Sequence, residues 1–266
     1  MKVSRFLLFQ LFLLSIFSRA SASVMILNGL THVHTGIGGN TISGIIKMRN
    51  EGKKGSRVVI YQQDLALSCD SPLDYKDLDA SSHSRSLGKW LKTNVDEKTL
   101  EPNEDYEVSY TINVPLNVKE DGTYWTIIMI EVAEPLREKS STGVNIDSKV
   151  RYAIQIITDV GLIKSPKLTF EKVEFKNTKP SEPKIIQIKL KNDGAFLART
   201  NLNIEIFNSV GEKIKVIKGV LKKVYPGYCN DFEIELIDLP KGKFEGILVA
   251  DNGKDLFGEN LTIEIE

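Results

Sequence analysis

The chain has few of the residues on which redox, metal and nucleophilic chemistry depend. Its 266 residues include only two cysteines and three histidines. It contains no Gly-x-Ser-x-Gly elbow and no His-Glu-x-x-His segment, the motifs that position reacting groups in several large enzyme families. We therefore expect a protein that is not an enzyme and that uses no cofactor.

Neither sign of charge is in excess, because 35 lysine and arginine residues balance 35 aspartate and glutamate residues. A nucleic-acid partner would require clustered basic residues to neutralise phosphates, so we expect no nucleic-acid binding. Long apolar runs are also missing after the amino-terminus. No later stretch has the ~20 apolar residues that a membrane-spanning helix needs.

The amino-terminus has the pattern of a secretory signal peptide. Lys2 and Arg5 form a basic end, Phe6 to Phe17 form an apolar run, and Ala20-Ser21-Ala22 supplies small residues for cleavage. A retained membrane anchor is the alternative, but the apolar run is shorter than the ~20 residues of a spanning helix. We expect a signal peptide over residues 1–22 and a mature protein that is periplasmic or secreted.

A pattern of strands and turns occurs twice in the chain. The matching segments are Ile45–Gly52 with Ile186–Gly194, Pro102 with Pro226, and Gly122–Tyr124 with Gly242–Phe244. Strand periodicity dominates throughout, and no window sustains the 3.6-residue apolar spacing of a helix. The pattern predicts an all-β protein with two tandem immunoglobulin-like β-sandwiches.

The repeat also predicts the domain boundaries. We expect a first sandwich over residues 23–157, a linker over 158–166 and a second sandwich over 167–266. The interval from Asn50 to Pro102 is longer than that from Asn192 to Pro226, which indicates an insertion near residues 66–87. An inserted loop is either a flexible excursion or a binding element, and the sequence favours neither.

The two cysteines, Cys69 and Cys229, fall one in each predicted domain. In an oxidising compartment they could pair, and closing so long a loop would contribute about 4 to 5 kcal/mol in the chain-entropy model. Cys69 lies in a predicted loop and Cys229 at a predicted strand start. Because these positions are unrelated in the repeat, we favour two unpaired thiols.

Asp121-Gly122-Thr123-Tyr124 resembles the tyrosine corner of immunoglobulin-like domains, in which the phenol hydroxyl ties a turn to the upstream backbone. The second domain has Phe244 at the matching position. It keeps the ring and lacks the hydroxyl, so this tether should be absent there.

The strand after this corner is apolar on both faces. If Tyr124 points into the core, Trp125, Ile127 and Met129 form a second apolar face. A contiguous apolar patch usually marks an interface, so we take Trp125, Ile127 and Met129, together with Trp90, as the candidate binding residues. The alternative, a cover supplied by the insertion or by the second domain, is simpler because it needs no partner.

Metal binding is not expected. His32 and His34 share a strand face, but the sequence supplies no evident third ligand, and two polar residues on a solvated edge strand are the simpler interpretation. Asp74, Asp77 and Asp79 depart from the calcium-loop spacing.

Part of the first domain resembles a known family. The residues that carry the resemblance are Trp90-Leu91, Leu100-Glu101-Pro102, Tyr110 to Pro115, Gly122 to Trp125, Gly143 to Ile146 and Arg151 to Ile154. In order and spacing they resemble the amino-terminal domain of the cell-surface WxL-interacting proteins. The resemblance implies an exported immunoglobulin-like domain that binds peptidoglycan or a surface protein. The chain differs from that family in having no carboxy-terminal membrane helix.

The two-sandwich layout is also similar to that of the periplasmic chaperones of pilus assembly, which donate an edge strand to subunits. In that comparison Val144 to Ile156 would be the donor strand. Our leading hypothesis is an exported, non-enzymatic binding or assembly protein of the cell envelope that recognises a surface polymer or a protein. The alternative is a chaperone that donates an edge strand to pilus-like subunits.

Overall fold

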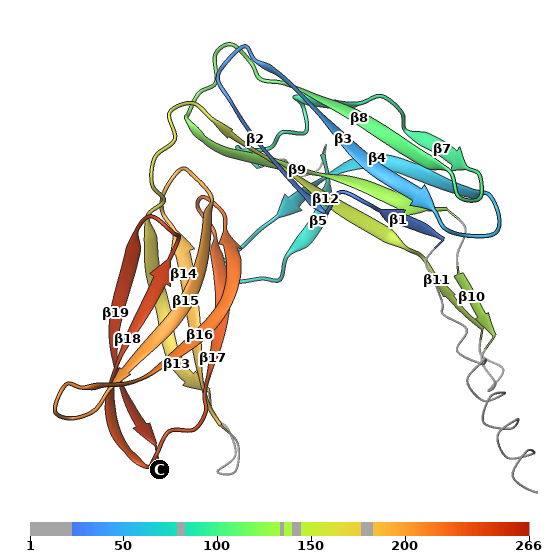
Figure 1. The fold of residues 1–266 in the computed structure, drawn as a ribbon. Helices are drawn as coiled ribbons and strands as arrows, with labels where there is room; N and C mark the ends of the chain where they lie inside the picture. The colour runs from blue at the N-terminus through green and yellow to red at the C-terminus, as the bar shows by residue number, and fades with distance from the viewer. Residues whose placement is uncertain (1–22, 79–82, 134–135, 140–144, 177–182, 266) are drawn as a thin grey trace, which may run out of the picture.

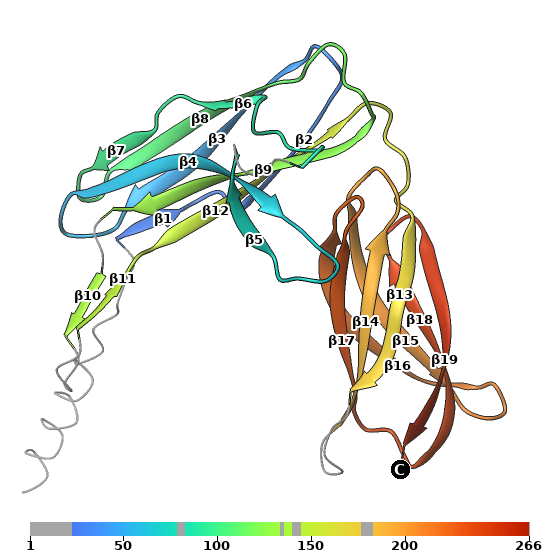
Figure 2. The ribbon, with the colours of Figure 1, turned by 180° about the vertical axis from the view of Figure 1, so that it is seen from behind.

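The structure, a computed structural model, describes residues 23–78, 83–133, 136–139, 145–176 and 183–265. The predicted signal peptide lies outside these residues. The described chain forms two β-sandwiches, as the sequence predicts, and they lie at an angle to each other (Figures 1 and 2). No helix in the described residues is long and apolar enough to cross a membrane.

The first sandwich is built from two sheets. One has the strand order β1-β3-β8-β6, and the other has the order β2-β12-β9-β4-β5 with β7 also paired to β4. The strands are β1 (Val24–Ile26), β2 (Thr31–Gly36), β3 (Thr41–Asn50), β4 (Ser56–Ala66), β5 (Asp74–Asp77), β6 (Leu91–Thr93), β7 (Glu97–Leu100), β8 (Asp105–Asn113), β9 (Gly122–Val132) and β12 (Arg151–Val160). The amino-terminal segment changes sheets, because β1 pairs antiparallel with β3 whereas β2 pairs parallel with β12.

The second sandwich packs the sheet β13-β14-β17 against the sheet β16-β15-β18-β19. Its strands are β13 (Leu168–Lys176), β14 (Lys184–Asn192), β15 (Ala198–Phe207), β16 (Lys213–Val224), β17 (Cys229–Leu236), β18 (Gly242–Asp251) and β19 (Leu256–Ile265). Alternate residues of these strands point inward and form a separate core that includes Ile186, Phe232 and Leu248. Each sandwich therefore has its own hydrophobic interior.

The repeated Asn-x-Gly segment has the same structural role in both domains. The Asn50 side chain is fully buried and donates to the carbonyl oxygens of Lys54 (2.8 Å) and Leu100 (3.0 Å), while its own oxygen accepts from the Gly52 amide. One side-chain amide thus supplies partners to backbone groups of the turn after β3. Buried carbonyls need such partners.

Asn192 repeats this arrangement after β14. Its side chain is also fully buried, donates to the carbonyls of Phe196 (2.7 Å) and Val224 (2.9 Å), and accepts from the Gly194 amide. The repeat in the sequence is therefore a repeat of one buried hydrogen-bonding device.

The tyrosine corner forms as expected. The Tyr124 hydroxyl donates to the Glu120 carbonyl at 2.8 Å. In the second domain the matching Phe244 is buried in the core and has no hydroxyl with which to make the tether. The faces of β9 also divide as predicted, since Tyr124, Ile128 and Ile130 belong to the first core while Trp125 and Ile127 point the other way.

The predicted strand from Val144 to Ile157 is not continuous. Part of it forms β11 (Asn145–Ser148), which pairs with β10 (Leu136–Lys139) in a hairpin of its own. The remainder is β12, which runs on to Val160 and so into the segment expected to be the linker. Pairing with β2 and β9 keeps these last residues within the sheet.

The structure also corrects the expectation of unpaired thiols. Cys69 and Cys229 form a disulfide across a sequence separation of 160 residues, with their Cα atoms 4.8 Å apart. Cys69 lies in the loop between β4 and β5, which belongs to the insertion, and this loop extends to the second sandwich (Figure 2). Cys69 and Cys229 do not occupy matching positions of the two repeats, but docking of the domains brings them together.

Replacing Tyr124 by Phe tests the tyrosine corner. The ring stays in the core, so only the hydrogen bond to Glu120 is lost, and we expect unfolding to become easier by about 1 kcal/mol. Urea denaturation followed by circular dichroism measures this. Tyr106→Phe is the matched control, because the Tyr106 hydroxyl has no hydrogen-bond partner among the described residues. Equal effects of the two changes would contradict the tether.

Candidate functional site

The second apolar face of β9 is closed inside the chain. Trp125 is 1% exposed, Ile127 is 1% exposed and Met129 is 4% exposed. They form one cluster with Tyr225 of the second domain, whose ring centroid lies 4.7 Å from that of Trp125. The structure thus corrects the expectation that this face is open to a partner and bears out the alternative of a cover within the chain. We call this cluster the domain joint.

The insertion supplies the rest of the cover. The His83 ring stacks on Trp125 with centroids 4.2 Å apart. Next to it, the Trp125 amide donates to the Arg85 carbonyl and the Trp125 carbonyl accepts from the Leu87 amide, both at 3.0 Å. The part of the insertion from His83 to Leu87 is therefore not a loose excursion, whereas residues 70–77 are exposed. The segment from His83 to Leu87 packs against the start of β9.

Trp90 lies on the opposite side of β9 from Trp125. Its ring centroid is 4.6 Å from that of Tyr124, and it packs against the first core. The four candidate residues therefore do not form one surface, since Trp90 faces the interior of the sandwich while Trp125, Ile127 and Met129 face the joint.

Hydrogen bonds also fix the position of the two domains at the joint. The Thr123 amide donates to the Ala195 carbonyl at 2.9 Å, and the Thr123 hydroxyl accepts from the Leu197 amide at 2.7 Å. From the other side, the Tyr225 hydroxyl donates to the Gln155 side chain at 3.3 Å. These bonds join β9 and β12 of the first domain to the turns and strands of the second.

Two cations of the second domain lie beside the joint. The Lys223 ammonium donates to the Thr31 hydroxyl at 2.9 Å and to the Gln155 side-chain oxygen. Burial, and then the charge of Arg199, lower the pKa of Lys223. Burial raises the pKa of Asp159 on β12, and the hydrogen bond from the Thr123 hydroxyl, followed by the charge of Arg199, opposes that shift. Both shifts arise from charges placed in a partly desolvated cleft.

This cleft contains a hollow of about 370 Å³ lined by Thr31, Val33, Arg199, Leu221, Lys222 and Lys223. Its charged side chains are all cationic. The lining is therefore suited to an anionic group more than to a cationic one.

The first domain has a free strand edge on β12. From Gln155 onward β12 is covered by β2, and the Gln155 amide donates to the Leu30 carbonyl at 2.9 Å. Before Gln155, no described strand pairs with that side. Because successive backbone groups alternate in direction, the N–H and C=O groups of Arg151 and Ala153 face this unpaired edge, while those of Tyr152 and Ile154 face β9.

This finding narrows the expected donor strand, Val144 to Ile156. Residues 155 and 156 are not available as an edge because β2 covers them, and Asn145–Ser148 pairs with β10. Within β12, the stretch from Arg151 to Ile154 is the part that is paired on one side alone.

Exposed apolar side chains occur in the segment that leads from β1 to the end of the free edge. Leu27 and Leu30 are both 48% exposed, in the segment where the chain crosses from one sheet to the other. Met25 of β1 is 38% exposed, and the Tyr152 hydroxyl, reaching from β12, donates to the carbonyl of neighbouring Val24. An unpaired edge flanked by exposed apolar groups is a site at which another strand can bind.

The two histidines of β2 share one partner. The Tyr110 hydroxyl lies 2.8 Å from Nδ1 of His32 and 2.9 Å from Nε2 of His34, and it joins the two sheets of the first sandwich. The Tyr110 ring passes directly over Gly44, where a Cβ atom would lie 2.2 Å from it. The described residues contain no cluster of three or more metal-ligating side chains.

No family model matches the chain, and no curated protein matches it. Solved structures do share its outline. The class 5 fimbriae chaperone CfaA is 12% identical, covers 91% of this chain and 99% of its own, and gives a TM-score of 0.46. The Escherichia coli chaperone DraB is 14% identical over 90% of this chain and 98% of its own, with a TM-score of 0.43.

A third structure, the complex of CsuC and CsuE from the archaic chaperone-usher pili of Acinetobacter baumannii, contains a chain that is 14% identical. It covers 90% of this chain and 98% of its own, with a TM-score of 0.45. Likeness at this level does not transfer function. None of the matches supports the resemblance to the WxL-interacting proteins.

Several residues that the site uses were not predicted from the sequence. Tyr225 precedes the repeated Pro226, so its position in the repeat was known, but its contact with Trp125 depends on docking. The contacts of Lys223 also depend on docking, whereas the stacking of His83 on Trp125 depends on how the insertion folds. Nothing in the sequence marked Leu30 as a binding residue, because a single exposed leucine is ordinary on a protein surface.

Truncating Trp125 to Ala tests the burial of the joint. Removing a buried indole leaves a cavity, and we expect a loss of about 3 to 5 kcal/mol in the free energy of unfolding. Guanidinium denaturation followed by circular dichroism measures it. Leu162→Ala is the control, because Leu162 is 71% exposed between the domains. A near-neutral Trp125→Ala variant would contradict the buried joint.

The histidines should make stability depend on pH. Burial lowers the pKa of His32, His34 and His83 below the ordinary value of 6.5. The unfolded chain therefore takes up protons first, so stability is full above about pH 6.5 and falls as the pH drops below it. Denaturation at pH 7 and pH 5 measures the fall.

The variant H32Q/H34Q/H83Q should lose most of this dependence between pH 7 and pH 5. Carboxylates titrate mainly below this window. A wild-type protein that is equally stable at both pH values would show that the imidazoles are not protected from protonation.

Proposed function

We propose that the protein is an exported, non-enzymatic assembly factor that holds an extended strand of a partner protein along the free edge of β12. The observation that carries the proposal is the stretch Arg151 to Ile154, which pairs with β9 on one side and with no described strand on the other. Backbone hydrogen bonds along such an edge give affinity, and neighbouring side-chain contacts give selectivity.

The surroundings of the edge support a protein strand as the bound segment. Leu30, whose carbonyl accepts from the Gln155 amide where the free edge ends, is 48% exposed and offers an apolar contact to a bound strand. The apolar face around Trp125, predicted as the contact for either a surface polymer or a protein, is closed inside the joint and supports neither.

The second domain supports this role by fixing the position of β12. Lys223 and Tyr225 both bond to Gln155, the residue at which the free edge ends. Strand capture then takes place on a preorganised edge, which lowers the entropic cost of binding. The predicted signal peptide and the disulfide both favour an oxidising compartment outside the cytoplasm.

Arg151→Pro tests the edge, because it removes the first backbone N–H that faces the unpaired side. Proline is tolerated at the first residue of a strand, so the fold should survive. Arg151→Ala is the matched control, since it also loses the ion pair with Glu131 but keeps the N–H. A photo-crosslinker placed at Ala153 in each protein reports capture in the exporting cell.

We expect Arg151→Ala to crosslink a partner through one of its strands and Arg151→Pro to lose about tenfold or more of this product, the equivalent of ~1.4 kcal/mol. The partner's yield of soluble protein should also fall when Arg151→Pro replaces the wild type. Equal crosslinking by the two variants, or crosslinks outside a strand of the partner, would contradict the proposal.

A further inference from the structure

The two cysteines join parts of the molecule that belong to different hydrophobic cores. Cys69 lies in the loop between β4 and β5, and Cys229 begins β17 opposite Lys191 of β14. Neither cysteine belongs to either sandwich core. The intervening chain, residues 70–228, includes more than half of each domain. The sulfur atoms meet only when the two domains have docked.

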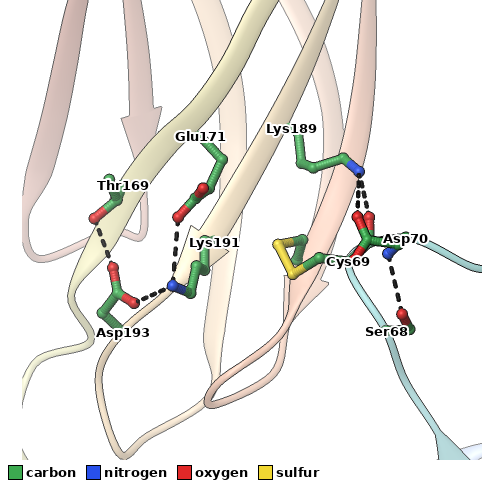
Figure 3. The surroundings of a disulfide bond; sticks show 9 residues. Ser68, Cys69, Asp70, Thr169, Glu171, Lys189, Lys191 and Asp193 are labelled. Atoms are coloured by element: carbon green, nitrogen blue, oxygen red, sulfur yellow. Dashed lines mark hydrogen bonds and ion pairs between the residues drawn. A yellow bond between two sulfur atoms is a disulfide. The ribbon is translucent and has the colours of Figure 1, made fainter.

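The contacts around Cys69 show how the loop is seated. Lys189 of β14 donates to the Cys69 carbonyl and lies 4.0 Å from the Asp70 carboxylate (Figure 3). The Ser68 hydroxyl accepts from the Asp70 amide at 3.0 Å and shapes the turn. The loop is therefore held against the second domain by polar contacts as well as by the disulfide.

The disulfide is reachable from outside. Both cysteines are only half-buried, Ser68 and Asp70 are exposed, and a hollow of about 410 Å³ lies beside them, lined by residues 68–72 together with Lys189, Cys229 and Asp231. A thiolate of another protein can approach a sulfur in such a setting. The charged side chains around the hollow are Lys189, which lies near the Asp70 carboxylate, and Asp231.

We propose that Cys69 and Cys229 form a thiol–disulfide exchange site that is oxidised after the domains have folded and docked, and that the disulfide then locks the domain joint. The oxidant is a protein disulfide of the Cys-x-x-Cys class. This inference goes beyond strand capture, because it concerns how the joint is completed and needs no bound partner.

The exchange takes place in two steps. The Cys69 thiolate attacks one sulfur of the donor disulfide, a mixed disulfide forms, and the other donor sulfur leaves as a thiolate. The Cys229 thiolate then attacks Cys69 Sγ and releases the second donor thiolate. The chain loses two electrons and two protons, and the donor becomes a dithiol. Cys69 is the entry point because its loop is free of strand pairing, whereas the Cys229 backbone is paired with Lys191.

The lock acts on the contacts of Trp125. Without the disulfide, the joint depends on the packing of Trp125 against Tyr225 and on the hydrogen bonds of Thr123. These contacts can open without unfolding either core, because each core is complete within its own sandwich. Local opening of this kind is seen in hydrogen exchange.

The chain contains only two tryptophans, so Trp90→Phe leaves Trp125 as the sole reporter. In this background, reduction or the change C69S/C229S should leave the far-ultraviolet circular dichroism unchanged. The indole N–H of Trp125 should exchange about tenfold or more faster, because opening of the joint becomes easier. Ser71→Ala in the same loop is the matched control and should not change the exchange rate. The same exchange measurement on the protein that retains Trp90 shows whether Trp90→Phe by itself changes the exchange rate of Trp125.

The donor step is tested with a purified thioredoxin-fold protein that carries a Cys-x-x-Cys disulfide. Added to the reduced, folded protein, it should restore slow exchange of Trp125. Cys229→Ser should trap a mixed disulfide through Cys69, and Cys69→Ser should trap about tenfold less. Unchanged Trp125 exchange on reduction would overturn the lock, and equal trapping by both variants would overturn the assigned entry point. Neither result depends on strand capture.

Discussion

The burial of Trp125 between the two sandwiches is the contact on which the rest of the structure depends. β9 is apolar on both faces, and a single sandwich can cover only one of them. The inner face completes the first core, so the outer face must be covered by something else. Tyr225 from the second domain and His83 from the insertion provide that cover. The relative position of the domains follows from this requirement.

The joint and the free edge are connected through β12. One end of this strand carries Ile157 into the joint, and Gln155 in its middle receives the side chains of Lys223 and Tyr225. The other end, from Arg151 to Ile154, is the unpaired edge. Docking of the second domain therefore acts directly on the strand that we propose as the binding site, with no intermediate element.

Much of the fold could be predicted from the sequence because it depends on local patterns. The equivalent turns after Asn50 and Asn192 follow from the repeated segments, and the hydrogen bond of Tyr124 follows from the spacing of the corner. Strand alternation correctly separated Ile128 and Ile130 from Trp125 and Ile127. The candidate site was less predictable from the sequence. Trp90 and Trp125 are both tryptophans of the first domain, and only the packing shows that Trp90 lies against the first core while Trp125 lies in the joint.

By itself the sequence determined the strand class, the duplication and the two-faced character of β9, since alternation and turn chemistry act over a few residues. Only the tertiary structure decided that Cys69 meets Cys229, that Tyr225 covers Trp125, and that β2 covers one part of β12 and leaves another open. These outcomes depend on residues that are far apart in the chain and on how two separately formed cores are placed. No local pattern of side chains specifies contacts between residues so far apart in the sequence.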